Sequence, residues 1–253
     1  MESKPRLLIT MGCSFTEGVG CFDYSILEKD VSEYTEGDKE YVHNNSLRYM
    51  LNNSWGSQLQ EMLNYESFLN LGKGNASNSE SAKLLFDKYY DNYFSQYEVL
   101  VIWLMSFSHR LSYYSGGHPK IYSHNNIIHD EVSKIQSNLD AGLEDLFYLR
   151  AVQSHADSKG WKFLFSHVEG ETLKVFRKYY KHQIPRFIDK KLYTSGLPPE
   201  KASKICGHPN ELGYQELATD IYEWIHEYRG ELISGNEVTD YYKERDSQYY
   251  FYK

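Results

Sequence analysis

Two short segments near opposite ends of the chain hold the side chains best suited to nucleophilic chemistry. Ser14 follows closely on an apolar run at residues 6–11, and His208 lies in a loop-to-helix segment at residues 207–214. A serine on a turn between a strand and a helix exposes its hydroxyl beside backbone N–H groups. An imidazole can take the proton of that hydroxyl, and the two side chains need only meet in space. We therefore consider them a candidate nucleophile and general base, although either residue taken alone is most often inert.

Strands and helices alternate along the chain and would bring both residues to one edge of a sheet. The run at 99–105 has no polar alternation, which is typical of a strand buried on both faces. Ser54 and Asn78 are suited to cap two of the helices. This alternation predicts a parallel α/β sheet with right-handed crossovers, whose ligands bind beyond the carboxyl ends of the strands. The predicted strands cover 6–11, 67–71, 99–105 and 161–166, and the predicted helices cover 54–63, 78–89, 131–158 and 210–228.

Three segments depart from this alternation. Residues 21–53 show no sustained period and are expected to form a long loop or insertion, and residues 106–130 form a loop rich in histidine and aromatic side chains. We expect a single domain over residues 1–233, followed by a tyrosine-rich tail at 234–253. The tail is either a frayed terminus or a docking strip for a protein partner, since clustered tyrosines are typical of interface anchors.

Composition excludes several function classes. The chain has 253 residues with 27 Lys and Arg against 35 Asp and Glu, a net charge of −8 that argues against a nucleic-acid binder. Its apolar runs are too short to span a membrane and no leader segment is recognisable, so we expect a cytoplasmic protein. Three scattered cysteines predict neither a disulfide framework nor a structural zinc site. The turn at 72–74 lacks the spacing of a phosphate-binding loop, and the histidines of the 106–130 loop fit no common zinc pattern. We expect no cofactor and no metal.

Four segments, in order, resemble the blocks of the SGNH (GDSL-type) hydrolase superfamily. They are Gly-x-Ser-x-x-x-Gly at 12–18, the polar turn at 70–78, the strand and its end at 99–106, and His-Pro-Asn-x-x-Gly-Tyr at 208–214. The cysteine before Ser14 and the tryptophan in the third strand are similar to forms often encoded by bacteriophages, in which case the cytoplasm would be that of a host cell. The resemblance implies a three-layer α/β/α fold with a parallel, flavodoxin-like sheet and long loop insertions.

The resemblance also implies roles for individual residues. Ser14 would be the nucleophile and His208 the general base. The oxyanion would be held by the Ser14 N–H, by an N–H of the second block and by a side-chain amide of the third. The second block offers Gly74 and then Asn75, which stands where the family usually has glycine, while Ser106 stands where the family has asparagine. The remaining candidates for the oxyanion or substrate site are Asn78, which could reach in place of Ser106, and Arg110, which could pair with an acidic substrate group or form a surface salt bridge.

The largest departure from the family lies just before His208. The family's orienting aspartate would fall at Ile205 or Cys206, and neither carries a carboxylate. Loss of a triad acid can lower kcat by about 10⁴-fold. Two functions therefore remain open. One is a serine esterase, such as an acetylesterase acting on a carbohydrate or a similar small ester. The other is a weak or catalytically inactive SGNH-fold binding or virion-associated protein. A carboxylate near His208, for example Glu17 or Asp23, would favour the enzyme.

Two further expectations concern the surroundings of the site. The tyrosines at 113, 114 and 122 are available to stack on sugar faces at the substrate rim. Cys13 is expected to be a buried neutral thiol, and Cys206 is expected to have a structural role rather than a reactive one.

Overall fold

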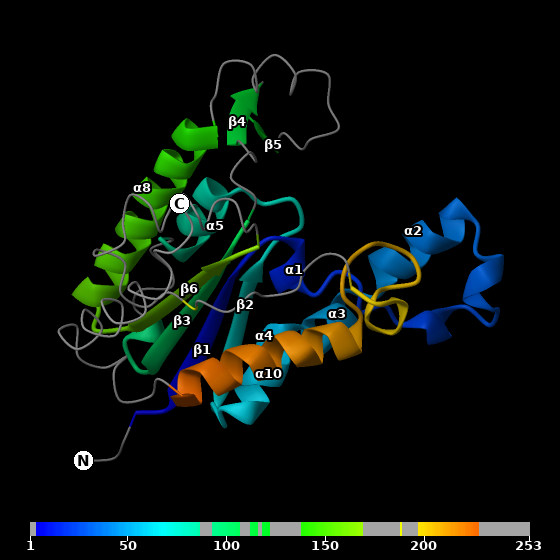
Figure 1. Cartoon of the computed structure of the whole chain (residues 1–253), viewed down its shortest axis with the longest axis horizontal. Coiled ribbons are helices and arrows are strands. Elements are labelled where there is room, and N and C mark those ends of the chain that lie inside the picture. Colours follow the sequence, from blue (N-terminus) through cyan, green and yellow to red (C-terminus); the bar gives the residue numbers. More distant parts are fainter. Residues whose placement is uncertain are drawn as a thin grey trace, which may run out of the picture.

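A four-stranded parallel sheet forms the centre of the protein, which is seen here in a computed structural model (Figure 1). The structure describes residues 4–86, 93–106, 112–115, 118–121, 138–168, 188 and 197–227, with the backbone alone at 112–121 and 138–143. The strands run in the spatial order β2-β1-β3-β6, and every neighbouring pair is parallel. They are β1 (Arg6–Gly12), β2 (Ser67–Gly72), β3 (Glu98–Met105) and β6 (Lys162–His167). The four predicted strands and their parallel pairing are confirmed.

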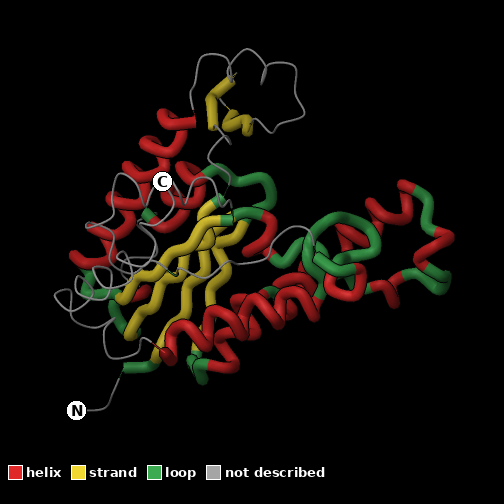
Figure 2. Tube along the Cα trace, viewed as in Figure 1, coloured by secondary structure: helices red, strands yellow, loops and turns green. Residues whose placement is uncertain are grey.

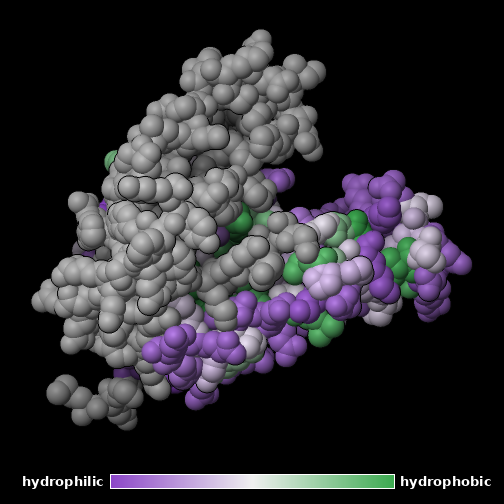
Figure 3. Space-filling model, in the orientation of Figure 1, coloured by the Kyte–Doolittle hydropathy of each residue, from purple (hydrophilic) through white to green (hydrophobic). Residues whose placement is uncertain are grey.

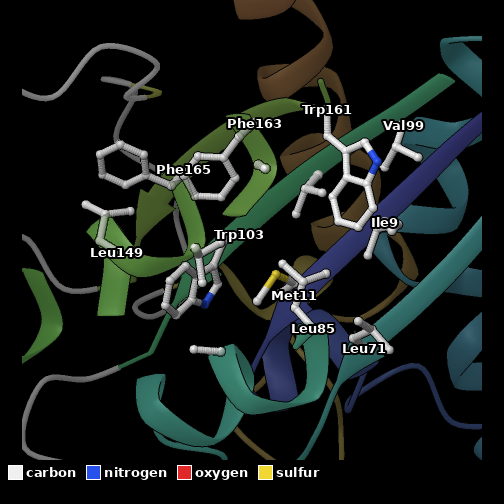
Figure 4. Packing of buried hydrophobic residues seen from close by; sticks show 14 of the residues in the cluster. Ile9, Met11, Leu71, Leu85, Val99, Trp103, Leu149, Trp161, Phe163 and Phe165 are labelled. Carbon is white, nitrogen blue, oxygen red and sulfur yellow. The ribbon is translucent and has the colours of Figure 1, made fainter. Parts of the chain in front are cut away.

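Helices cover both faces of this sheet (Figure 2), so the predicted α/β/α layering is confirmed. On one face, α5 (Asn78–Leu85) and α8 (Asn138–Ser158) pack against alternate strand residues. On the other face, α4 (Trp55–Met62) and α10 (Glu211–Glu227) pack against the intervening ones. Figure 4 shows the α5–α8 face, where the aromatic side chains of Trp103, Phe163 and Phe165 lie among aliphatic residues from β1 and the helices.

Strand β3 is buried on both of its faces, as its unbroken apolar sequence predicts. Trp103 belongs to the core under α5 and α8, while Ile102 and Leu104 belong to the core under α4 and α10. A strand between two helical layers has no solvent-facing side, so each residue can be apolar. The adjacent β1 follows the same rule, with six of its seven residues buried, and this holds the turn carrying Ser14 on a rigid base.

The helix caps were predicted correctly in one case and one residue off in the other. Ser54 caps α4, and its hydroxyl accepts a hydrogen bond from the Ser57 N–H. The cap of α5 is Ser77, whose hydroxyl accepts from the Glu80 N–H, and Asn78 is the first helical residue. Serine and asparagine are similar in capping strength, so sequence alone does not separate adjacent candidates.

Residues 21–53 are mostly helical, which corrects the expectation of a long loop. Figure 1 shows the segment extending away from the sheet as an arm. Thr35 caps its first α-helix through a capping box with Asp38. The arm has a small core of its own around Val42 and Met50. Hydrophilic and hydrophobic patches alternate on the visible face of the arm in Figure 3. Helices α2 and α3 each bury a single residue, so no strong apolar period marks them. The arm contains the 3₁₀ helices η1 (Tyr24–Ile26) and η2 (Val31–Glu33), and the helices α2 (Glu36–Asn45) and α3 (Leu47–Asn53).

The remaining described elements are short. The segment 106–130, expected to be a loop, contains an antiparallel pair, β4 (Ser112–Ser115) with β5 (His118–Ile121). Helix α1 (Ser14–Glu17) follows β1, and η3 (Pro199–Lys201) precedes the His208 loop. The tail at 234–253 lies outside the described residues, and the single-domain boundary stays a prediction. In the part that is described, no helix is both long and apolar enough to cross a membrane.

Candidate active site

The structure brings Ser14 and His208 into direct contact. Ser14 Oγ lies 2.8 Å from His208 Nε2, a hydrogen bond between residues 194 positions apart in the chain. Ser14 is the first residue of α1 at the carboxyl end of β1, and it is 6% exposed. A nucleophile and base within hydrogen-bond reach define the minimal geometry for proton transfer out of a serine hydroxyl.

The turn that presents Ser14 is held closed by tight packing around Gly12. A Cβ added at Gly12 would lie 2.5 Å from the Leu104 carbonyl oxygen of the adjacent strand, and the residue has a φ of +151°. Thr16, one turn into α1, donates its hydroxyl to the Met11 carbonyl at 3.2 Å. Glycine alone combines this backbone conformation with this close approach. The Ser14 hydroxyl is therefore positioned by backbone contacts on both sides of the turn.

His208 sits in a loop that closes on itself through backbone hydrogen bonds. The Ser203 N–H donates to the His208 carbonyl at 2.9 Å, and the Asn210 N–H donates to the Lys201 carbonyl at 2.9 Å. The Asn210 side chain donates a hydrogen bond to the Glu200 carbonyl and accepts one from the Gly213 N–H at the start of α10. The loop is thereby fixed to the first turn of a long helix, which holds the imidazole at the edge of the sheet.

The His208 loop rests directly on the chain that follows α1. Gly20, with a φ of +116°, lies so close that an added Cβ would be 2.1 Å from the Pro209 carbonyl oxygen and 3.0 Å from the His208 Cβ. The buried Tyr214 hydroxyl of α10 donates to the Val19 carbonyl at 2.8 Å. The ring of Phe15 lies 4.9 Å, centre to centre, from the imidazole. These contacts join the Ser14 segment and the His208 segment into one unit.

The second block lies against the same turn. Its Lys73 N–H donates to the Gly12 carbonyl at 3.1 Å. The Asn70 side chain donates to the Thr16 carbonyl at 2.8 Å and accepts from the Gly72 N–H. Asn75 has a φ of +60°, a left-handed conformation that asparagine adopts more readily than most residues. This explains how asparagine can occupy a position that is usually glycine in the resembled family.

Two backbone N–H groups stand out as candidate oxyanion donors. The Gly74 N–H donates to the Glu17 carboxylate, so it is already engaged. Within the described part of the chain, the N–H groups of Ser14 and Asn75 have no hydrogen-bond acceptor. Ser14 is buried, while Asn75 is exposed and its N–H is open to solvent. An oxyanion hole requires N–H groups that are not already used by the protein. Of the two residues expected in the second block, Asn75 rather than Gly74 therefore remains the candidate donor.

The side chain expected to complete the oxyanion hole is engaged elsewhere. Asn78 uses its two amide hydrogens on the Ser106 carbonyl and on the carboxylate of Asp145 in α8. Both hydrogens are thus committed, and Asn78 lies between the second and third blocks rather than reaching toward the Ser14 hydroxyl. Ser106 is fully buried at the end of β3. Arg110, and the tyrosines and histidines of the 106–130 loop, lie outside the residues whose side chains the structure describes.

The residues considered as acids or thiols near His208 have identifiable contacts. The Glu17 carboxylate accepts from Gly74, and the Asp23 carboxylate accepts from the N–H and hydroxyl of Ser25. Ile205 and Cys206, which stand where the family has its aspartate, pack against the core of the arm. Cys13 is fully buried, and burial raises the pKa of Cys21 far above its usual range. Cys13 and Cys21 belong to the core under α4 and α10, and the structural role of Cys206 stays a prediction. No cluster of three metal-binding side chains occurs among the described residues.

Three positioning residues escaped sequence reasoning. Gly20 has a φ of +116° and lies against Pro209, so it sets the spacing between the Ser14 segment and the His208 segment. The Ser203 hydroxyl accepts from the N–H groups of Ile205 and Cys206 and contacts the Tyr24 hydroxyl of the arm at 3.3 Å. Asn210 could have been found as the residue preceding a helix, where asparagine is favoured.

Glu17 gives a testable pH dependence of stability. Burial raises the pKa of this carboxyl, and the Gly74 hydrogen bond and the charges of His43 and Lys73 offset the rise only in part. A raised folded-state pKa favours the protonated form, so stability is lost as pH rises through that pKa. We expect Glu17→Gln, which keeps an acceptor oxygen, to raise Tm at pH 7.5 and to have no effect near pH 4.

The measurement is thermal unfolding followed by circular dichroism at both pH values. Glu61→Gln, on the exposed side of α4, is the control for loss of a surface charge. A lower Tm for Glu17→Gln at pH 7.5 would show that the ionised carboxylate stabilises the fold, contrary to the expectation.

The chain was compared with protein-family models, curated proteins and solved structures, and only solved structures match it. No protein-family model matches the chain, and neither does any curated protein. A family 2 carbohydrate esterase with a carbohydrate-binding domain, from Corynascus thermopiles (Myceliophthora fergusii), superposes with a TM-score of 0.57 at 10% identity, over 91% of this chain and 68% of that one. A family two carbohydrate esterase from Clostridium thermocellum, solved with cellohexaose, superposes with a TM-score of 0.52 at 10% identity, over 91% and 66%. A lipase/acylhydrolase from Enterococcus faecalis matches at 13% identity over 87% and 95%, with a TM-score of 0.47.

The sheet and the structural matches together define the fold class of this protein. The parallel four-stranded sheet between two helical layers matches the α/β/α fold of the SGNH hydrolases. Two of the solved structures that superpose on this chain are carbohydrate esterases. At such low identity, the likeness shows the fold alone.

Proposed function

We propose that this protein hydrolyses carboxylic esters through Ser14 and His208. The observation that carries the proposal is the 2.8 Å hydrogen bond between Ser14 Oγ and His208 Nε2. It occurs at the carboxyl end of the central strand, where open α/β sheets bind their ligands. The N–H groups of Ser14 and Asn75, which have no acceptor among the described residues, would supply the second requirement for acyl transfer, stabilisation of an oxyanion.

The chemistry follows from these groups. Ser14 Oγ attacks the ester carbonyl carbon while His208 Nε2 takes the hydroxyl proton. The carbonyl oxygen becomes an oxyanion that accepts hydrogen bonds from the two N–H groups. His208 returns the proton to the departing alcohol, leaving an acyl-serine. Water then attacks the acyl-serine, His208 takes the water's proton and returns it to Ser14 Oγ, and the carboxylic acid is released.

For the substrate, we propose an acyl group, such as acetyl, on a carbohydrate. Two structural neighbours with TM-scores above 0.5 are carbohydrate esterases, one of them solved with cellohexaose. A chain with a net charge of −8 suits a neutral glycan better than a polyanion. The tyrosine-rich loop after β3 would supply aromatic surface for sugar faces. The similarity to phage-encoded forms and a partner bound by the tail stay predictions.

The test is labelling with a fluorophosphonate followed by intact-mass measurement. An activated serine displaces fluoride from the reagent and keeps the phosphonate, so the substrate need not be known. We expect one adduct on the parent protein, and none on Ser14→Ala or His208→Ala. Ser158→Ala and His226→Ala replace the same residue types at exposed or partly exposed helix ends and should label like the parent.

A folded parent protein that takes no adduct would contradict the proposal. The same result would favour the second function, a catalytically inactive SGNH-fold binding protein, which the missing aspartate before His208 supports. Circular dichroism on each variant separates loss of labelling from loss of folding. A labelled parent justifies a screen of acetylated glycans, with acetate release as the readout.

A further inference from the structure

A buried polar cluster lies at the carboxyl end of the sheet, apart from the Ser14–His208 pair. Asn78 begins α5, Ser106 follows β3, and Asp145 lies in α8. Their exposed fractions are 2%, 0% and 5%. The cluster thus joins the second block, the third block and a helix that carries no residue of the proposed mechanism.

The Asn78 side-chain amide is hydrogen-bonded to both the backbone N–H and the backbone carbonyl of Ser106. The Ser106 N–H donates to Asn78 Oδ1 at 2.7 Å, and Asn78 Nδ2 donates to the Ser106 carbonyl at 3.0 Å. Asn78 Nδ2 also donates to Asp145 Oδ1 at 2.7 Å. A carboxylate only accepts hydrogen bonds, so Asp145 requires the NH₂ end of the amide on its side and thereby fixes the orientation of the whole clasp. We call these three residues the amide clasp.

Keeping an acid at this position is energetically costly. Asp145 Oδ2 is buried and has no hydrogen-bond partner among the described residues, and the buried His167 Nε2 lies 3.7 Å from it. Burying a carboxylate that is only partly hydrogen-bonded destabilises a fold compared with a neutral group of the same size. Costs of this kind are concentrated at sites where function depends on exact geometry.

The register of the sheet places the clasp beside the nucleophile. Gly12 is level with Leu104 on β3 and with Gly72 on β2. Ser14 and Ser106 therefore each lie two residues beyond the same level, on adjacent strands. Asn75, the candidate oxyanion donor, comes three residues before Asn78 on the connection from β2. Fixing Asn78 to Ser106 fixes the spacing between the second and third blocks on either side of Ser14.

We propose that Asn78 and Asp145 are positioning residues that hold the oxyanion side of the site in place. The inference rests on the proposed hydrolase function. Hydrogen-bond donors stabilise a transition state only when they are already oriented, so a clasp that sets the loop spacing acts on kcat rather than on substrate affinity. Asn78, expected from the sequence to be a direct donor, then contributes by orienting the donors around it.

The test compares Asp145→Leu with Asp145→Asn, using kcat and KM for 4-nitrophenyl acetate. Leucine removes the acceptor but fills a similar volume, and we expect kcat to fall about tenfold or more, because small misplacements at a site can cost up to about 10²-fold. KM should stay within a factor of about two, as expected when only transition-state contacts are lost. Asparagine retains an acceptor oxygen for Asn78 and should keep kcat within about threefold of the parent.

Val152→Ala separates positioning from stability, because it opens a cavity at a fully buried site of the same helix, seven residues along from Asp145 and outside the clasp. We expect it to lower Tm and leave kcat unchanged at 20 °C. If Asp145→Leu lowers Tm but keeps the parent kcat, the clasp is structural only and the inference is overturned. If Asp145→Leu does not fold, Asn78→Ala is read in the same way. A parent without Ser14-dependent turnover would instead overturn the proposed function itself.

Discussion

Replacing Ser14 with alanine is expected to lower kcat for 4-nitrophenyl acetate by about 10⁴-fold or more, since loss of a nucleophile removes the covalent pathway entirely. Alanine takes away the oxygen that forms the bond, while the backbone of the turn, held by Gly12 and Thr16, stays in place. Tm should therefore change little. KM is expected to stay close to its parent value, because the hydroxyl contributes little to ground-state binding.

His208→Ala is expected to cause a loss of similar size, and the double variant should be no worse than either single one. The two residues act as a unit across a single 2.8 Å hydrogen bond, so removing the second has no further effect once the first is gone. The measurement is steady-state hydrolysis for the parent, both single variants and the double variant. Multiplicative losses in the double variant would show that the residues act separately and would contradict a nucleophile–base pair.

Gly20→Ala is expected to be the most damaging substitution outside the reacting groups. Its Cβ would lie 2.1 Å from the Pro209 carbonyl oxygen, and its φ of +116° is one that side-chain-bearing residues rarely adopt. The His208 loop must move away, and a displacement of about 1 Å can cost about 10²-fold in rate. Forcing alanine into this backbone region should also destabilise the fold by about 1–3 kcal/mol.

Gly207→Ala is the matched control for this prediction. Gly207 is adjacent to His208 in the same loop, but an added Cβ there meets no atom within 4 Å. We expect its kcat and Tm to stay near those of the parent. The two variants are compared by steady-state kinetics and thermal unfolding at one pH. Equal effects of the two substitutions would show that flexibility of the loop, rather than its contact with Gly20, controls the position of His208.

Much of the fold follows from local pattern. The four parallel strands could be predicted because a strand buried between helical layers must be apolar along its whole length, as residues 99–105 are. Ser54 could be assigned as a cap because its side chain acts on a backbone N–H only three residues away. Ser14 and His208 stood out because turn and helix-start signals place each of them at the edge of a sheet. These features depend on neighbours within one element.

The arm at 21–53 shows where local pattern fails. Its helices bury few residues each, and they pack on one another and on Ile205 and Cys206, which lie more than 150 positions away. Helices stabilised by tertiary packing rather than by a continuous apolar stripe leave a weak period in the sequence. The expectation of a loop was therefore wrong for a physical reason, and only the folded chain shows what the segment packs against.

The sequence by itself determined the layered α/β architecture and the chemical identity of the candidate pair, because periodicity and residue type are local properties. The tertiary structure decided how the parts meet: Gly20 contacts the His208 loop, the Gly74 N–H donates to Glu17, and Asn78 is hydrogen-bonded to Ser106. Each of these depends on the distance between atoms of residues from different elements. Such distances follow from the packing of the whole core, which no window of sequence contains.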